Sequence, residues 1–180
     1  MKKNLYIQFE NNFFDKIINK KRIEMINLIK KKINVKQIKD LLDIGTTQDL
    51  SADSSNIFCK KLDNIKIHKS ISNQKIKNKR FKHCIKKSIT SKFSKKTIST
   101  FKSDLVISSA TIEHVGNLKN QISKIKNMIS LSKKYVVIST PNQFYPIEFH
   151  TKLPMLHWLP KSLYRKILLF FNMKYFADEK

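Results

Sequence analysis

Apolar and polar positions repeat along the chain with two periods, one typical of helices and one typical of strands. Residues 12–32 place isoleucine, phenylalanine and methionine three or four positions apart, with lysines between them, which predicts an amphipathic helix. Short apolar or alternating runs predict strands at 38–44, 65–71, 81–89, 104–109 and 135–140. Helical spacing and capping residues predict further helices at 57–62, 92–101, 117–131 and 161–175.

Strands that alternate with helices favour an α/β fold class. We expect a mostly parallel sheet of about five strands, flanked by helices and joined by right-handed crossovers. The sequence has neither an internal repeat nor a flexible linker, so we expect one domain over 1–180. Its parts are an N-terminal helix at 12–33, a core at 38–140, an aromatic and proline-rich segment at 141–160, and a last helix at 161–175.

The helix at 117–131 carries its own start signal and an apolar stripe. Asn117 is expected to cap its first turn. Its inner stripe is predicted to consist of Leu118, Ile122, Ile125, Met128 and Ile129.

Composition adds a large positive charge to this picture. The 180 residues carry a formal net charge of +24, mostly from lysines spread among isoleucine and asparagine. An AT-rich genome imposes such a bias on any protein, so we interpret the charge as a solvated lysine surface. Arginine, which suits bidentate contacts to phosphates and bases, occurs only at Arg22, Arg80 and Arg165. A specific nucleic-acid partner is therefore not expected.

Two cysteines, Cys59 and Cys84, cannot form a disulfide framework or a zinc-binding cluster. No metal site is expected, and a reduced, cytoplasmic protein is predicted. The basic N-terminus lacks the apolar core of a signal peptide, and no run approaches the roughly 20 apolar residues of a membrane span.

The turn after the first strand is the best candidate for a ligand site. Asp43 and then Gly45 follow an apolar run, and ligands of open α/β sheets bind at the carboxyl ends of strands. Thr47 and Leu50 stand where a dinucleotide-binding fingerprint would have glycines, and a nucleotide-binding Gly-x-x-x-x-Gly-Lys loop is absent from the sequence. A carboxylate here repels phosphate and suits a cationic ligand, such as an ammonium group next to a sulfonium.

Three stretches in order carry a resemblance to a known family. Residues 38–47 resemble the first motif of the class I S-adenosylmethionine-dependent methyltransferases, Asp/Glu-x-Gly-x-Gly, with Thr47 in place of the second glycine. Residues 101–115 are similar to the fourth-strand motif of the small-molecule branch, which ends in Leu-Glu-His, and 135–142 resemble its fifth-strand end. The resemblance covers roughly residues 35 to 145 and implies a Rossmann-like fold with S-adenosylmethionine as cofactor.

The resemblance also implies roles for individual residues. Glu113 and His114 would act on the acceptor in catalysis. Asn73 stands where the family usually has an acidic residue for the ribose hydroxyls, and 88–90 where it has one near the adenine amine. The implied cofactor-binding set is Asp43, Gly45, Thr46, Thr47, Asn73, Ser88, Thr90 and Ser109, and the implied substrate-binding set is His150, His157 and Trp158.

Each role has a structural alternative. Asp43 can cap a turn instead of anchoring the cofactor's methionine end. His114 can pack below the site or cap the following helix instead of orienting or deprotonating an acceptor, and Glu113 can interact with that helix N-terminus. The segment 141–160 can form a lid, cover an apolar substrate, or touch a membrane surface through nearby basic residues.

The expected function is methyl transfer to a small-molecule, sugar or lipid-precursor acceptor. The family usually adds an antiparallel C-terminal hairpin, which is missing after the last predicted helix, so the exposed sheet edge is expected to favour a homodimer. The alternatives are a truncated, non-catalytic remnant of the fold and a basic nucleic-acid-binding protein, whose binding would weaken steeply with salt.

Overall fold

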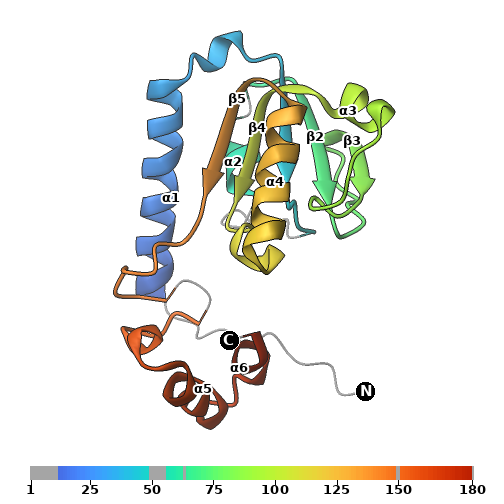
Figure 1. Ribbon diagram of the computed structural model, residues 1–180. Coiled ribbons are helices and arrows are strands. Elements are labelled where there is room, and N and C mark those ends of the chain that lie inside the picture. Colours follow the sequence, from blue (N-terminus) through green and yellow to red (C-terminus); the bar gives the residue numbers. More distant parts are fainter. Residues whose placement is uncertain (1–11, 49–55, 63, 149–150, 180) are drawn as a thin grey trace. The chain divides into compact units, whose positions relative to one another are not determined.

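The computed structural model of the protein describes residues 12–48, 56–62, 64–148 and 151–179 (Figure 1). The chain forms two compact units. One is Arg22–Thr140, and the other combines the segments Met1–Lys21 and Pro141–Lys180. The boundary between the units falls within helix α1, Asn12–Lys32.

The unit Arg22–Thr140 contains a five-stranded sheet whose strands are all parallel (Figure 1). The strand order is β3-β2-β1-β4-β5, so the order reverses between β1 and β4. The strands are β1 (Asp40–Ile44), β2 (Ile67–Ser72), β3 (Phe81–Lys86), β4 (Ser103–Ser109) and β5 (Ser132–Ser139). The short helix η1 (Val35–Gln37) precedes β1. The helical segments between the strands are α2 (Ile57–Lys61), α3 (Lys95–Phe101), η2 (Glu113–Val115) and α4 (Leu118–Leu131). The α/β fold class and the parallel sheet predicted from the sequence are confirmed.

The central strands of the sheet are buried on both faces, and their successive side chains point to opposite sides. Leu41 and Leu105 pack with the residues of α1 from Met25 onward and with α2. Leu42 and Val106 pack on the other face with α3 and α4. All five residues of β1 are buried, which explains why the strand consists of leucine and isoleucine apart from its two aspartates. The result is a three-layer arrangement with a core on each side of the sheet.

Helix α4 begins where the sequence predicts but turns a different stripe inward. The Asn117 side chain accepts a hydrogen bond from the Asn120 backbone N–H at 3.0 Å, which confirms the predicted cap. The buried residues of α4 are Lys124, Met128 and Leu131. Of the stripe predicted to face inward, Leu118, Ile122 and Ile129 are exposed, so that prediction is wrong for these three residues.

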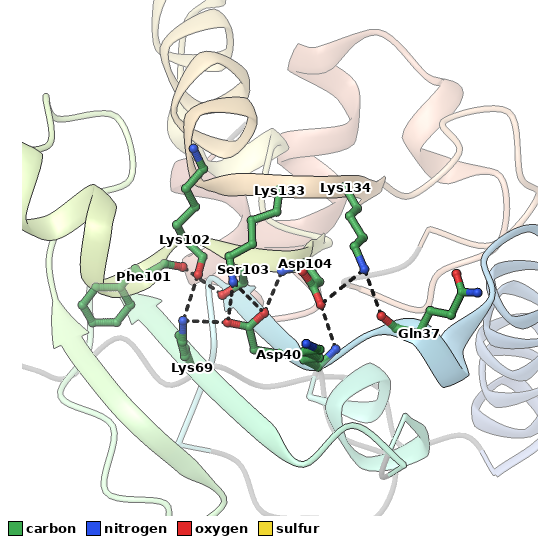
Figure 2. Close-up of polar contacts among 10 residues, drawn as sticks. Gln37, Asp40, Lys69, Phe101, Lys102, Ser103, Asp104, Lys133 and Lys134 are labelled. Atoms are coloured by element: carbon green, nitrogen blue, oxygen red, sulfur yellow. Dashed lines mark hydrogen bonds and ion pairs between the residues drawn. The ribbon is translucent and has the colours of Figure 1, made fainter.

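The buried carboxylate of Asp40, at the start of β1, contacts residues of three other strands (Figure 2). It accepts a hydrogen bond from the Asp104 backbone N–H at 2.8 Å and one from the Lys69 ammonium at 2.9 Å. Lys133 lies 3.3 Å away, and Lys69 also donates to the Lys102 carbonyl at 2.9 Å. One side chain on β1 thereby contacts β2, β4 and β5.

These contacts lower the pKa of Asp40 below its usual value of 3.8. Burial raises this pKa, but the Asp104 N–H and the Lys69 and Lys133 ammonium groups outweigh it. A carboxylate with a lowered folded-state pKa stabilises the fold above its unfolded-state value and loses that contribution as the pH falls through the folded-state value.

The described part of the second unit contains η3 (Leu156–Trp158), α5 (Lys161–Phe170) and α6 (Lys174–Glu179). The single helix predicted at 161–175 is therefore wrong beyond Phe170. Asn172 adopts a φ of 59°, in the left-handed region that ends a right-handed helix. The break lets α5 and α6 bury Leu168 and Phe176 in one small core.

The helices of the described residues are all too short or too polar to cross a membrane.

Replacing Asp40 by Asn is expected to lower the free energy of unfolding at neutral pH by about 3–5 kcal/mol, because Lys69 would remain buried without its carboxylate. Urea unfolding measures this change. The matched control is Lys133→Met, which removes a half-exposed partner of Asp40 and should cost about 1 kcal/mol or less. Equal losses in the two variants would contradict the central role of the Asp40–Lys69 pair.

Candidate functional site

A pocket of about 160 Å³ opens at the carboxyl ends of β1 and β2, beside the point where the strand order reverses. Open α/β sheets bind ligands at such a switch point. Its wall includes the ends of both strands and the turns that follow them, at 44–47 and 71–74. Lys87 and Ile89 after β3, Thr111, His114 and Val115 after β4, and Lys124 from α4 complete the wall. All of these residues belong to the unit Arg22–Thr140.

Gly45 makes the turn out of β1 and packs directly against Thr111. Its φ is 93°, a conformation that other residues adopt only with strain, and its N–H donates to the Ile71 carbonyl at 2.9 Å. A Cβ built on Gly45 would lie 2.4 Å from Thr111 Cγ2. The absence of a side chain therefore lets the turn after β1 meet the turn after β4.

The Asp43 side chain is buried beneath this turn and does not line the pocket. Its Oδ2 accepts a hydrogen bond from Thr46 Oγ1 at 2.8 Å, and Thr46 Oγ1 accepts one from Ser70 Oγ at 2.8 Å. Burial raises the pKa of Asp43 to about 6, although the Thr46 hydroxyl, the Cys59 thiol and the Lys124 ammonium act in the opposite direction. Asp43 thus fixes the turn and supplies negative potential to the pocket from below.

Thr46 and Thr47 both reach the pocket wall, but their polar groups are engaged within the protein. The Thr46 carbonyl accepts a hydrogen bond from Ser72 Oγ at 2.6 Å. The Asn56 amide pairs with both backbone groups of Thr47, accepting from its N–H at 3.1 Å and donating to its carbonyl at 3.0 Å. A loop that cradles phosphate needs backbone N–H groups aimed at the ligand, and here the Thr47 N–H serves the protein instead.

Lys124 is the most unexpected member of the pocket, since its exposed fraction is 0%. Its ammonium donates to Thr111 Oγ1, and Ser108 Oγ donates to the Ile44 carbonyl at 3.1 Å. The 2.5 Å contact between Thr111 Oγ1 and Ser108 Oγ must then have Thr111 as donor, because the Ser108 proton is already used. The lysine is thereby linked through two hydroxyls to the end of β1.

Burial lowers the pKa of Lys124 to about 8, while the carboxylates of Glu113 and Asp43 act in the opposite direction. At neutral pH the pocket therefore holds a buried ammonium close to negative charge. Sequence reasoning missed this residue because a lysine within a helix is normally solvated. The signal in the sequence is that Lys124 lies four residues before Met128 and seven before Leu131, which places it on the same buried face of the helix.

The two implied catalytic residues lie in the short helix η2 but face different surroundings. His114 lines the pocket and is exposed. Glu113 does not line it: Oε2 accepts from Thr140 Oγ1 at 3.4 Å, and Oε1 is buried without a hydrogen-bond partner among the described residues.

The remaining implied cofactor residues are divided. Asn73 lines the pocket directly after β2 and is exposed. Ser88 and Thr90 lie outside the pocket wall and hydrogen-bond each other at 2.9 Å, while Ile89 between them lines it. Ser109 lies at the end of β4 and accepts from Ser139 Oγ at 3.0 Å, also outside the wall.

The implied substrate residues belong to the other unit. The His157 ring and the Trp158 indole N–H both contact the Gln143 carbonyl, at 3.0 and 2.9 Å. These contacts tie the two ends of the segment 143–158 together, which is a structural role. His150 lies outside the described residues.

Replacing Gly45 by Ala is expected to lower the free energy of unfolding by about 2–4 kcal/mol, combining φ strain with a clash against Thr111. Gly116→Ala is the matched control: its φ is 86°, but its nearest neighbour would be 3.7 Å from the new Cβ. It should cost only about 1–2 kcal/mol. Adding Thr111→Ser to Gly45→Ala removes the clashing methyl group and should recover part of the lost free energy of unfolding. If urea unfolding shows that the losses of the two single variants simply add in the double variant, the contact between Gly45 and Thr111 is contradicted.

Asp43→Asn is expected to change how stability depends on pH. A carboxyl whose folded-state pKa is raised from 3.8 to about 6 stabilises the fold at low pH and loses that contribution as the pH rises through 6. Relative to the variant, the wild type should therefore lose about 1–3 kcal/mol between pH 4 and pH 7 in urea unfolding. A difference that stays constant over this range would contradict the burial of an ionising Asp43.

Comparisons with protein-family models, with curated proteins and with solved structures gave no match to this chain.

Proposed function

We propose that the pocket binds S-adenosylmethionine and that the protein transfers its methyl group to a small-molecule, sugar or lipid-precursor acceptor. The observation that carries the proposal is the position of the pocket at the carboxyl ends of β1 and β2, next to the Gly45 turn. The strand order β3-β2-β1-β4-β5 supports it, because this order creates a binding crevice at β1 and β4.

The turn after β1 favours this cofactor over a nucleotide whose phosphates are held by backbone N–H groups. The Thr47 N–H is bonded to Asn56, and the buried Asp43 carboxylate opposes an incoming dianion. A sulfonium carries the opposite charge and gains from the same carboxylate.

The residues of the pocket fit separate parts of the cofactor. Asn73 can hydrogen-bond ribose hydroxyls, and Ile71, Ile89 and Val115 provide apolar surface for the adenine ring. The volume of about 160 Å³ is below the roughly 300–1,000 Å³ typical of sites for drug-sized ligands, so the pocket holds part of the molecule as it stands.

When bound, S-adenosylmethionine supplies an activated methyl group, and the protein's task is to align the acceptor with it. His114 lies in the pocket wall, and the unprotonated ring nitrogen of a neutral imidazole can take a proton from an acceptor. Glu113 beside it acts indirectly in this proposal, through the charge that it presents to Lys124.

Asn73→Asp is expected to bind S-adenosylhomocysteine about three- to tenfold more tightly than the wild type, because a carboxylate accepts stronger hydrogen bonds from ribose hydroxyls than an amide does. Asn73→Ala should bind it about three- to tenfold more weakly. Isothermal titration calorimetry measures both changes, and the exposure of Asn73 makes either variant compatible with the fold.

The control is Lys126→Gln, which lowers the net charge by the same amount as Asn73→Asp at an exposed position of α4 outside the pocket. It should bind S-adenosylhomocysteine as the wild type does. If folded wild-type protein shows no binding heat with either S-adenosylmethionine or S-adenosylhomocysteine, the proposed function is wrong.

A further inference from the structure

The charge of Lys124 is not neutralised by direct contact with any residue that the structure describes. Of the described residues, none forms an ion pair with its ammonium, although Asp43 and Glu113 are near enough to raise its pKa. The hydrogen bond to Thr111 uses one of the three N–H donors of the ammonium group. Burying such a group costs several kcal/mol unless it is paired, so its place in a pocket wall indicates a ligand rather than a structural role.

We propose that Lys124 is the anion-binding residue of the pocket and that it takes the carboxylate of the cofactor's amino-acid end. This assignment rests on the proposed function. It adds a binding residue on α4, outside the segments that resemble the family's motifs. A carboxylate that enters the pocket would pair with the ammonium in the pocket wall, where Thr111 already holds the lysine in place.

The charges around Lys124 favour a carboxylate within a zwitterion over a phosphate. Asp43 lies below the turn and Glu113 lies on η2, and both act electrostatically on the lysine. Their negative charge opposes a phosphate dianion but favours the ammonium group that an amino acid carries next to its carboxylate. The pocket wall also carries Lys87, which is partly exposed, so Lys124 is its buried cation. Together with the negative potential of Asp43 and Glu113, this buried cation matches an α-amino acid group.

The test compares two nucleosides in isothermal titrations with wild-type protein and with Lys124→Met. S-adenosylhomocysteine has the amino-acid end, and 5′-methylthioadenosine lacks it but keeps the adenine, ribose and sulfur. Lys124→Met is expected to weaken S-adenosylhomocysteine binding about tenfold to hundredfold, the size of a lost charged hydrogen bond. Binding of 5′-methylthioadenosine should stay within about twofold of the wild-type value, because this ligand has no carboxylate.

Two controls keep the comparison interpretable. Lys126→Met makes the same replacement at an exposed position of the same helix, and it should leave both affinities unchanged. Thermal unfolding of Lys124→Met checks the fold, and we expect no loss of stability because an apolar side chain replaces a buried charge. Lys124→Gln, which can still donate to Thr111, is the second variant and should show the same selective loss.

The outcomes separate the two proposals. If S-adenosylhomocysteine binds the wild type and both Lys124 variants within about twofold, the assignment of Lys124 is wrong while the proposed function stands. Equal weakening of both nucleosides by folded Lys124→Met also overturns the assignment, because it indicates a general change in the pocket. If neither nucleoside binds the wild type, the proposed function is wrong and the assignment falls with it.

Discussion

The sheet depends on the contacts that the carboxylate of Asp40 makes with other strands. This carboxylate joins the start of β1 to Lys69 on β2, to the Asp104 N–H on β4 and to Lys133 on β5 (Figure 2). Parallel strands gain their alignment from such contacts and from side-chain packing, because each crossover leaves the register open. The pocket opens at the carboxyl ends of the strands, and the positions of these ends follow from this alignment.

Around the pocket, the hydroxyl groups of serine and threonine connect buried charges to the turns by hydrogen bonds. Ser70 is hydrogen-bonded to Thr46, which is hydrogen-bonded to Asp43. In the same way, Ser108 is hydrogen-bonded to Thr111, which is hydrogen-bonded to Lys124. Both buried charges have pKa values moved toward neutrality by desolvation. Groups held in this way respond strongly to any ion that enters the pocket, since the local dielectric is low and the groups are already ordered.

The proposed cofactor and the proposed role of Lys124 both follow from that electrostatic arrangement. A ligand with a sulfonium, an ammonium and a carboxylate gains from negative potential and from one fixed cation, whereas a phosphate would find its usual backbone donors engaged. In this interpretation Asp43 acts through its field from beneath the turn, and the direct contacts come from Asn73, Lys124 and the apolar wall.

The sequence by itself determined the order of strands and helices between residues 38 and 140, the parallel sheet and the turn beside which the pocket opens, because apolar periods and the glycine at residue 45 depend on local chain geometry. Tertiary structure alone decided which charges are buried. The apolar stripe at 118, 122 and 129 was expected to face inward, yet the fold buries Lys124 on another face of α4. Only the packing of α4 against the turn after β4 brings Thr111 to that lysine, and a contact between two successive segments of different structure leaves no period in the sequence.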